Sequence, residues 1–258
     1  MRIRQWVLQG FRTGIRTTHY PRAEERAPGV SPGLPAMVTE VAEKQGARLV
    51  EICPTGAIES ENGLVRLDLR RCVHCFRCAR ESDAQLRWET GYEWARFTAG
   101  AKQPAWPRGF SKSLHIRVVD AGDCGACLSE VKQLNNPYYN MHRLGFFFTP
   151  TPRKADILLV VGPVTDQMRG PLQEAYGAMP TPKLVMAVGA CALSGGVFGP
   201  SFFSGAGVGR LLPVDVEVPG APPPPLAILH GLLVAVGRKV PVSLPAAPAA
   251  QVTEDKFA

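Results

Sequence analysis

The spacing of the seven cysteines constrains the fold of this 258-residue chain more than any other feature. Two of them form the pair Cys124-Gly-Ala-Cys127, and a third, Cys191, follows much later on a glycine-rich turn. A strand-like apolar run at 155–162 lies between them, so the three thiols can meet only if a folded sheet brings two loops together. Thiolates in such spacings are typical ligands of soft metals and iron–sulfur clusters.

The other four cysteines form a second group closer to the N-terminus. Three follow one another as Cys-Val-His-Cys-Phe-Arg-Cys, and the fourth begins a Cys-Pro-Thr-Gly-Ala-Ile sequence. A C-x-x-C-x-x-C loop can wrap three thiolates around one face of a cubane while its backbone amides point at the sulfurs. A structural zinc site also uses four thiolates, but the Cys-Pro sequence and its separation from the triplet favour [4Fe–4S]. The predicted ligands are Cys53, Cys72, Cys75 and Cys78.

Cysteine usage and charge limit the compartment and the class of partner. Every cysteine lies in a C-x-x-C spacing, a Cys-Pro or a glycine-rich turn, which indicates ligands rather than scattered core thiols. An odd number in a chain of this length does not suit a disulfide framework, so a reducing cytoplasm is predicted. The formal charge of +7 fits an acidic partner, an anionic membrane surface or nucleic acid. We expect no nucleic-acid partner, because the chain has no recognisable nucleic-acid-binding module.

The first 36 residues are predicted to form a basic amphipathic helix and a linker. Apolar residues recur near helical spacing among several arginines over residues 1–20, and Pro21 is expected to end the helix. Such a helix can lie in a lipid interface or pack on a partner subunit, and both remain open. Residues 22–36 are rich in proline and glycine, as linkers are. No apolar run is long enough to span a bilayer, and no secretory signal is expected.

Residues 37–113 are predicted to form a small α+β domain with a connector. The expected elements are a helix at 37–44, a strand at 47–52 and a hairpin over 58–68 with its turn at 61–63. His74, between two predicted ligands, is expected to be an exposed spacer, and tuning of the cluster potential is the alternative. Residues 84–113 carry three of the four tryptophans and are expected to pack the two domains together.

Residues 114–239 are predicted to form an α/β domain, followed by a Pro/Ala-rich tail at 240–258. Near-continuous apolar strands alternate with helical patterns, which indicates a parallel sheet covered on both faces. Such sheets place their sites at the carboxyl edge, where the cysteine loops follow strands. His230 is expected to be a satisfied core or interface histidine. The expected strands are 115–120, 146–149, 156–162, 183–189 and 212–218, and the expected helices are 128–135, 166–179 and 226–238.

The first cysteine group resembles the bacterial-type ferredoxin domain. Two-cluster members of that family carry C-x-x-C-x-x-C-x-x-x-C-P twice, with each Cys-Pro serving the other cluster. Here Glu43, Gly46 and Leu49 occupy the slots of the first triplet, and Ser82 replaces the second Cys-Pro cysteine. The resemblance therefore implies one complete [4Fe–4S] site with no ligand left over.

The second block, from 115 to 238, is similar to the cluster-bearing small subunit shared by respiratory complex I and membrane-bound [NiFe] hydrogenases of the formate hydrogenlyase type. The C-x-x-C form lies nearer the hydrogenase branch. The start of the chain, with Gly14-x-x-Thr17-x-x-Tyr20-Pro21, is similar to the ferredoxin-like subunit of those complexes, so the chain resembles a fusion of two neighbouring electron-transfer subunits. The segments that carry the resemblance are Cys124-x-x-Cys127-x-x-Glu130, Thr151-Pro-Arg153-Lys-Ala-Asp156, Gly162-Pro-Val-Thr165, Gly189-Ala-Cys191, Gly195-Gly196, Pro213-Val-Asp215 and Val218-Pro-Gly220.

The chain departs from this family at the fourth cluster ligand. The family has a cysteine after the Pro-Gly pair, whereas this chain has Ala221. Four outcomes remain open: a [4Fe–4S] cluster with water or a carboxylate (Glu130 or Asp123) at the fourth corner, a [3Fe–4S] cluster, a site that has lost its cluster, or a ligand from a partner chain. A bound cluster with an atypical fourth corner is favoured. The carried-over thiolates are those of Cys124, Cys127 and Cys191.

Charged residues near the two cysteine groups also have predicted roles. Glu130 matches a family carboxylate near the cluster, and stabilisation of a helix N-terminus is the alternative. Arg153 would bond the cluster sulfurs or a partner carboxylate, and an ordinary surface arginine is the alternative. The arginines near the first group would offset cluster charge and dock an acidic partner, or form a solvated basic face. These arginines are Arg70, Arg71, Arg77 and Arg80.

The predicted fold class is α/β, with a C-terminal flavodoxin-like parallel sheet covered by helices and a small α+β ferredoxin-like domain before it. The predicted function is an iron–sulfur electron-transfer subunit of a membrane-associated, hydrogenase-like or complex I-like oxidoreductase, not catalytic alone. Its expected partners are a large hydrogenase or quinone-reductase-type subunit, membrane subunits, and an anionic membrane surface bound by residues 1–20. The expected location is the cytoplasmic face of the inner (plasma) membrane. The alternatives are a docking subunit without its second cluster and a flavodoxin-like flavin enzyme, which would need a phosphate-binding loop that is missing here.

Overall fold

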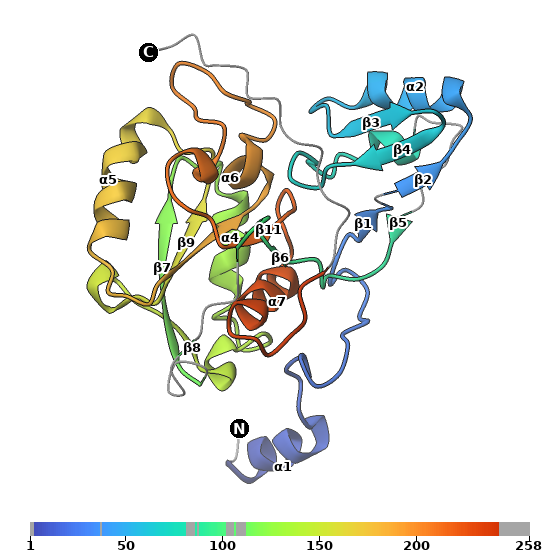
Figure 1. Ribbon diagram of the computed structural model, residues 1–258. Helices are drawn as coiled ribbons and strands as arrows, with labels where there is room; N and C mark the ends of the chain where they lie inside the picture. Colours follow the sequence, from blue (N-terminus) through green and yellow to red (C-terminus); the bar gives the residue numbers. More distant parts are fainter. Residues whose placement is uncertain are drawn as a thin grey trace.

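The computed structural model describes residues 3–36, 38–80, 86, 88–101, 106 and 112–242. Most of the predicted tail at 240–258 and parts of the connector at 84–113 lie outside these residues. The described chain forms a large α/β unit and a smaller α+β unit beside it (Figure 1). Within the described residues, none of the helices combines the length and the apolar character that crossing a membrane requires.

A six-stranded sheet forms the centre of the larger unit. Its strand order is β6-β11-β10-β9-β7-β8, and every pair is parallel except β6–β11. The predicted α/β fold class is therefore confirmed, with an antiparallel edge strand that the connector contributes. The strands are β6 (Arg96–Phe97), β7 (Leu114–Asp120), β8 (Phe146–Phe148), β9 (Ile157–Val161), β10 (Leu184–Val188) and β11 (Val216–Val218).

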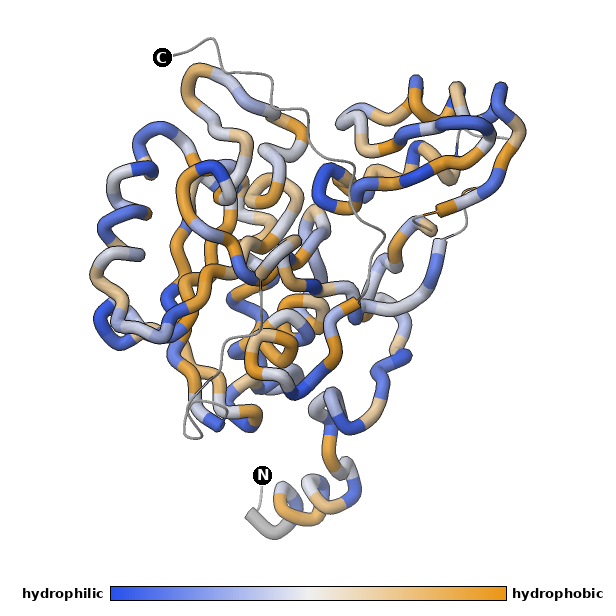
Figure 2. The backbone as a smooth tube through the Cα atoms, viewed as in Figure 1, coloured by the Kyte–Doolittle hydropathy of each residue, from blue (hydrophilic) through white to orange (hydrophobic). Residues whose placement is uncertain are grey.

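Helices cover both faces of this sheet, and its strands β9 and β10 are apolar on both sides. In β9, Ile157, Leu159 and Val161 belong to the core beneath α4 (Ala126–Gln133) and α7 (Pro225–Ala235). Leu158 and Val160 belong to the core on the opposite face, with α5 (Asp166–Gly177) and α6 (Ala190–Ser194). Figure 1 shows α5 and α7 on opposite sides of the sheet, and Figure 2 shows the hydrophobic residues that run along the strands.

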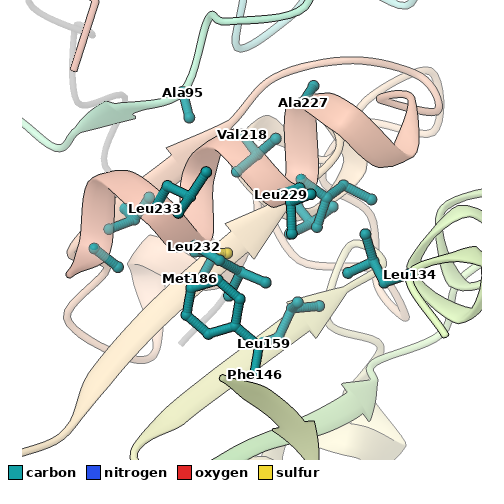
Figure 3. Close-up of a cluster of buried hydrophobic side chains, with 14 of the residues drawn as sticks. Ala95, Leu134, Phe146, Leu159, Met186, Val218, Ala227, Leu229, Leu232 and Leu233 are labelled. Carbon is teal, nitrogen blue, oxygen red and sulfur yellow. The ribbon is translucent and has the colours of Figure 1, made fainter. Parts of the chain in front are cut away.

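Helix α7 is apolar on all sides because it is enclosed by the rest of the domain. Every residue from Pro225 to Ala235 is buried. Leu229, Leu232 and Leu233 belong to the same core cluster as Met186 of β10 and lie together in the close-up (Figure 3). Burial of a Leu side chain contributes about 1.5–3 kcal/mol. This helix therefore fixes the sheet beneath the second cysteine group.

His230 is a satisfied core histidine, as predicted. Its side chain is 0% exposed. The Ala95 amide donates to Nδ1 at 3.1 Å, and Nε2 lies 3.3 Å from the Val240 carbonyl oxygen. Nδ1 therefore accepts a hydrogen bond and Nε2 donates one, which requires a neutral ring. Burial lowers the pKa of His230 and so favours this neutral form.

The smaller unit is an antiparallel sheet with one helix packed on it. The strand order is β2-β4-β3, with β2 at Val38–Glu40, β4 at Leu64–Leu67 and β3 at Ile58–Glu61. The predicted hairpin is present, and its turn residues Asn62 and Gly63 have φ of 52° and 77°. Two successive left-handed residues are what a two-residue type I′ hairpin turn requires.

The predicted helix at 37–44 and strand at 47–52 are wrong. Strand β2 occupies part of the first range, and helix α2 (Glu43–Ile52) covers the second. The buried residues of α2 are Gly46, Leu49 and Ile52, which recur at every third position and face β3 and β4. A Cβ at Gly46 would stand 2.1 Å from Ser60 Oγ, so glycine lets the helix approach the sheet closely. The segment 47–52 therefore forms part of a helix with one buried face, although its short apolar run also suits a strand.

The described residues of the N-terminal segment and the connector include the predicted helix and short strands that were not predicted. Helix α1 (Ile3–Thr13) ends at Gly14, where φ is 63°, rather than at Pro21. The linker contributes β1 (Leu34–Pro35), which pairs with β5 (Trp88–Glu89) of the connector. The other short helices are α3 (Arg77–Arg80), η1 (Met141–Leu144), η2 (Pro152–Lys154) and η3 (Val208–Arg210).

Candidate functional site

The four cysteines of the first group converge between α2 and the loop after β4. Cys53 follows the last turn of α2, Cys72 and Cys75 lie in the loop, and Cys78 lies in α3. All four are free, half-buried thiols that line one small pocket, which Trp88 also lines. The structure therefore brings together the complete predicted ligand set of this group.

Burial opposes negative charge on two of these thiols, because it raises the pKa of Cys72 and of Cys78. Burial and the charges of the other three thiolates together raise the pKa of Cys72 to about 12, while a backbone hydrogen bond at His74 acts in the opposite direction. The Ala57 amide donates to Cys53 Sγ at 3.2 Å. Iron bound to such thiols would keep them deprotonated.

The ligand loop is held by aromatic packing and left-handed backbone. His74 and Phe76 have φ of 50° and 61°, which turns the chain sharply between the cysteines. Phe76 stacks on Trp88 at 4.1 Å, and the His74 ring meets Trp88 and Trp94 edge-on at 5.8 and 6.1 Å. His74 is only 8% exposed, so its predicted role as an exposed spacer is wrong. Tryptophans from the connector cover it.

Arginines brace this loop instead of forming only a solvated face. Arg71 Nη1 donates to the Gly56 carbonyl at 3.1 Å, and Arg80 Nη2 donates to the Cys75 carbonyl at 3.0 Å. Both bonds tie an arginine to backbone next to a predicted ligand. Their positive charges would also offset the negative charge of a cluster.

The second cysteine group lies at the carboxyl edge of the large sheet. Cys124 is exposed before α4, Cys127 is buried in the first turn of α4, and Cys191 lies in α6 after β10. A Cβ at Gly189 would stand 2.5 Å from Cys127 Sγ, and a Cβ at Gly196 would stand 2.6 Å from Cys191 Sγ. The absence of a side chain at each glycine therefore leaves room for a thiol. The backbone at Gly189, two residues before Cys191, lies against the Cys127 thiol of α4.

The three thiols and the carboxylate of Asp123 act on one another electrostatically. Burial raises the pKa of Cys127, followed by the negative charges of Asp123, Cys191 and Cys124. Burial also raises the pKa of Cys191, followed by the charges of Cys124 and Asp123. The structure therefore brings together the three thiols that the sequence predicted, and it adds a carboxylate to them.

Position 221 lies where a fourth ligand would be expected. The Gly220 carbonyl, one residue before Ala221, accepts a 2.7 Å hydrogen bond from the Ala190 amide, next to Cys191. Ala221 is half-buried and offers only a methyl group. Glu130 lies one turn beyond Cys127 in α4; burial raises its pKa, and its charge has the smallest of the effects on Cys127.

Arg153 lies away from the cysteines, so the structure does not support its predicted place at the cluster. It is exposed on η2, between β8 and β9. The register pairs Ile157, the first residue of β9, with Ile116 near the start of β7, whereas the cysteine loop follows Asp120 at the other end. The residues after β8 therefore enter β9 at the amino edge of the sheet.

The two cysteine groups adjoin each other through the contact between the two units. Ser194 Oγ, three residues after Cys191, donates to the carbonyl of Arg70 at 2.9 Å, and Arg70 lies two residues before Cys72. Trp94 Nε1 donates to the Pro219 carbonyl at 2.8 Å, so the tryptophan that covers His74 also reaches the segment before Ala221. These contacts could not be found from cysteine spacing.

A buried carboxylate completes this junction. Glu217 of β11 is only 4% exposed. Its Oε2 lies 2.7 Å from Arg96 Nε, and its Oε1 lies 3.6 Å from Arg70 Nε. The sequence signal for these ion pairs was the glutamate between two valines of a strand. A buried carboxylate is almost always paired, so this position called for a partner.

Both groups have the donor chemistry of an iron–sulfur site. Within the described residues, no set of three or more His, Cys, Asp or Glu side chains is close enough to hold one metal ion. In a cluster each thiolate binds a different iron atom, so the ligands need not lie that close together. The soft thiols of both groups fit such a cluster. So do the amide donor at Cys53 and the glycines that leave room beside the sulfurs of Cys127 and Cys191.

Comparison with known proteins gives a family match within the larger unit and several similar proteins. A family model described as NADH ubiquinone oxidoreductase, 20 Kd subunit, matches residues 124–235. An uncharacterized protein of Methanocaldococcus jannaschii is 44% identical over 122 residues, which cover 47% of this chain and 82% of that protein. The probable membrane-bound hydrogenase subunit mbhJ of Pyrococcus furiosus is 45% identical over 120 residues, or 46% of this chain and 72% of that subunit.

A third relative is longer than the region it shares with this chain. Formate hydrogenlyase subunit 7 of Escherichia coli is 40% identical over 126 residues, which cover 49% of each chain. The family match includes all three cysteines of the second group, and it begins at Cys124. The first group lies outside the matched residues.

Proposed function

Because the chain belongs to the family of the NADH ubiquinone oxidoreductase 20 kDa subunit, we propose that it relays electrons between two iron–sulfur clusters in a membrane-associated, hydrogenase-like oxidoreductase. Relatives are named as subunits of a membrane-bound hydrogenase and of formate hydrogenlyase. The chain would work with the other subunits of such a complex. When bound, clusters supply one-electron transfer, and the protein holds them in place and sets their potentials.

Each cysteine group holds one cluster in this proposal. The first group, on the ferredoxin-like unit, would bind a [4Fe–4S] cluster through Cys53, Cys72, Cys75 and Cys78. The second group would bind a [4Fe–4S] cluster with an atypical fourth ligand, or a [3Fe–4S] cluster, through Cys124, Cys127 and Cys191. Amide donors and the nearby arginines would stabilise the negative charge of the first cluster.

The observation that carries the proposal is the shared junction between the two groups. The hydrogen bond from Ser194 to Arg70 joins the segments that carry Cys191 and Cys72. Trp94 packs against His74 of one ligand loop and donates to Pro219 of the other site. Two clusters held across such a packed contact would lie close together without intervening bulk water, which suits electron transfer between them.

The carboxyl edge of the sheet is the proposed contact with a large hydrogenase or quinone-reductase-type subunit. Cys124 is exposed at this edge. The loop after α6 exposes Phe198, Phe202 and Phe203, and Phe202 is 94% exposed. The Asp166 amide donates to the Phe203 carbonyl at 2.9 Å, which anchors the loop beside α5. Apolar rings around an exposed ligand suit a subunit interface through which electrons pass.

Helix α1 is the proposed contact with an anionic membrane at the cytoplasmic face. Its apolar residues Trp6 and Phe11 are 69% and 81% exposed. Figure 2 shows hydrophobic residues along this helix, and Arg12 lies in its last turn. An amphipathic helix of this type can bury its apolar face among acyl chains while its cations meet anionic headgroups. Membrane subunits of the complex could contact the same helix.

A Phe11→Ser variant should bind phosphatidylglycerol vesicles at least about tenfold more weakly, because burying a Phe side chain contributes about 1.5–3 kcal/mol. Vesicle co-sedimentation at low salt measures this binding. Gln9→Ser, in the same helix and also exposed, serves as the matched control and should bind as the native chain does. Equal binding of all three proteins would exclude α1 as the membrane contact.

The competing function is a docking subunit that has lost its second cluster, and iron analysis separates the two. Anaerobically prepared protein should contain about seven or eight irons per chain. A Cys191→Ala variant should lose about three or four of them, together with one of two electron paramagnetic resonance (EPR) signals. About four irons in both proteins would support the docking subunit, in which only the first group binds a cluster.

A further inference from the structure

The second cysteine group has three thiols and, next to Cys124 in the chain, the carboxylate of Asp123. The following inference rests on the proposed function, because it concerns the cluster that this group would hold. Ala221 cannot bind iron, so any fourth ligand within the chain must come from another residue. Two carboxylates, those of Asp123 and Glu130, act electrostatically on the Cys127 thiol.

The carboxylate of Asp123 is held in place between Cys124 and Cys127. Its Oδ2 accepts hydrogen bonds from the Gly125 and Leu128 amides, both at 3.0 Å. Its own amide donates to Asp120 Oδ1 at 2.7 Å, which fixes the backbone at the end of β7. Side chain and main chain are therefore both positioned before any ligand binds.

The second oxygen of this carboxylate is buried and unused. Asp123 Oδ1 is shielded from solvent and has no hydrogen-bond partner among the described residues. Buried carboxylate oxygens are normally paired, because an unpaired one loses its hydration without compensation. A free, buried oxygen on the residue before Cys124 indicates a partner that the polypeptide itself does not supply.

The hydrogen bonds of Oδ2 place this carboxylate close to the cysteine pair. Its two amide donors belong to Gly125 and Leu128, the residues that follow Cys124 and Cys127. The segment that carries the third thiol adjoins the pair, because a Cβ at Gly189, two residues before Cys191, would stand 2.5 Å from Cys127 Sγ. The negative charge of Asp123 also adds to the larger effect of burial, which raises the pKa of Cys127 and of Cys191.

We propose that Asp123 Oδ1 is the fourth ligand of a [4Fe–4S] cluster held by Cys124, Cys127 and Cys191. The carboxylate binds the fourth iron directly and takes the place of a water molecule, with no change in the number of electrons. Oδ2 keeps its two amide hydrogen bonds, so binding needs no rearrangement of the loop. The iron with the oxygen ligand differs from the three with sulfur ligands and is the easiest to lose.

The test uses the full-length protein, reconstituted anaerobically with iron and sulfide. Asp123→Asn keeps an oxygen that can accept from the Gly125 and Leu128 amides but replaces the anionic ligand by a neutral amide. It should lose about one iron per chain and show the EPR signal of an oxidised [3Fe–4S] cluster. Asp123→Cys should retain the full iron content and lose the distinct iron site in the Mössbauer spectrum. Glu130→Gln is the matched control and should resemble the native protein.

The possible outcomes separate this inference from the proposed function. If Cys191→Ala removes a cluster while Asp123→Asn keeps native iron content and spectra, Asp123 is not the ligand. If the native protein already holds a three-iron cluster at this site, Asp123 is likewise not the ligand. If neither variant changes a native content of about four irons, the second cluster itself is absent. Thermal unfolding of each apo-protein identifies any variant that lost its cluster by misfolding.

Discussion

A Cys72→Ser variant is expected to lose about four irons per chain, roughly half of the total, because the hydroxyl of serine is a poor substitute for a thiolate ligand. Cys72 packs against the apolar core of the smaller unit, and burial raises its pKa to about 12. With this pKa the Cys72 thiol stays protonated at neutral pH unless a cation such as iron binds it. Iron and acid-labile sulfide assays on anaerobically prepared protein measure the loss.

The same substitution should also weaken the fold of the smaller unit. Metal binding stabilises a folded domain because the assembled site does not exist in the unfolded chain. Limited proteolysis should therefore cut the segment between α2 and α3 faster in Cys72→Ser than in the native protein. Val73→Ala changes a neighbouring residue that is not a predicted ligand, and it should keep its iron. Native iron content in Cys72→Ser would contradict the four-thiolate site.

A Gly196→Ala substitution is expected to destabilise the larger unit by about 2–4 kcal/mol and to disturb the second cluster. The added Cβ would stand 2.6 Å from Cys191 Sγ and 3.1 Å from the Cys191 backbone. The φ of 59° at this position adds strain for any residue with a Cβ. Because the obstacle is backbone as well as a sulfur, it cannot be relieved by a rotamer change alone.

Gly199→Ala is the matched control for this substitution. Its φ is 61°, but its Cβ would meet nothing within 4 Å. We therefore expect only the conformational cost, about 1 kcal/mol, and an unchanged EPR spectrum. Urea unfolding of both apo-variants gives the difference. Equal destabilisation of the two variants would mean that Gly196 is not needed to seat the Cys191 thiol.

The parallel sheet could be predicted because its strands β9 and β10 are unbroken apolar runs between turn residues. Both faces of β9 are buried, so the pattern shows no alternation and cannot be confused with an exposed strand. The hairpin could be predicted from Asn62-Gly63, because these residues adopt left-handed backbone readily. Helix α2 could not, since a short apolar run suits either a strand or the buried face of a helix.

The predicted ligands were found from spacing alone, whereas their surroundings depend on tertiary contacts. His74 is buried because Trp88 and Trp94 return from a connector that has no clear periodicity. Arg153 belongs to a recognisable motif, but the parallel register places it at the opposite edge of the sheet from the cysteines. The free oxygen of Asp123 could be recognised only once its other hydrogen bonds were known.

Magnetic interaction between the two clusters is the most direct test of the electron relay. EPR spectra of the fully reduced native protein are compared with the sum of the spectra of Cys72→Ser and Cys191→Ala, each of which should retain one cluster. Because the two cysteine groups meet at the Ser194–Arg70 contact, the native spectrum should be broadened or split relative to that sum. A native spectrum equal to the sum, or one that shows a single cluster, would contradict the relay.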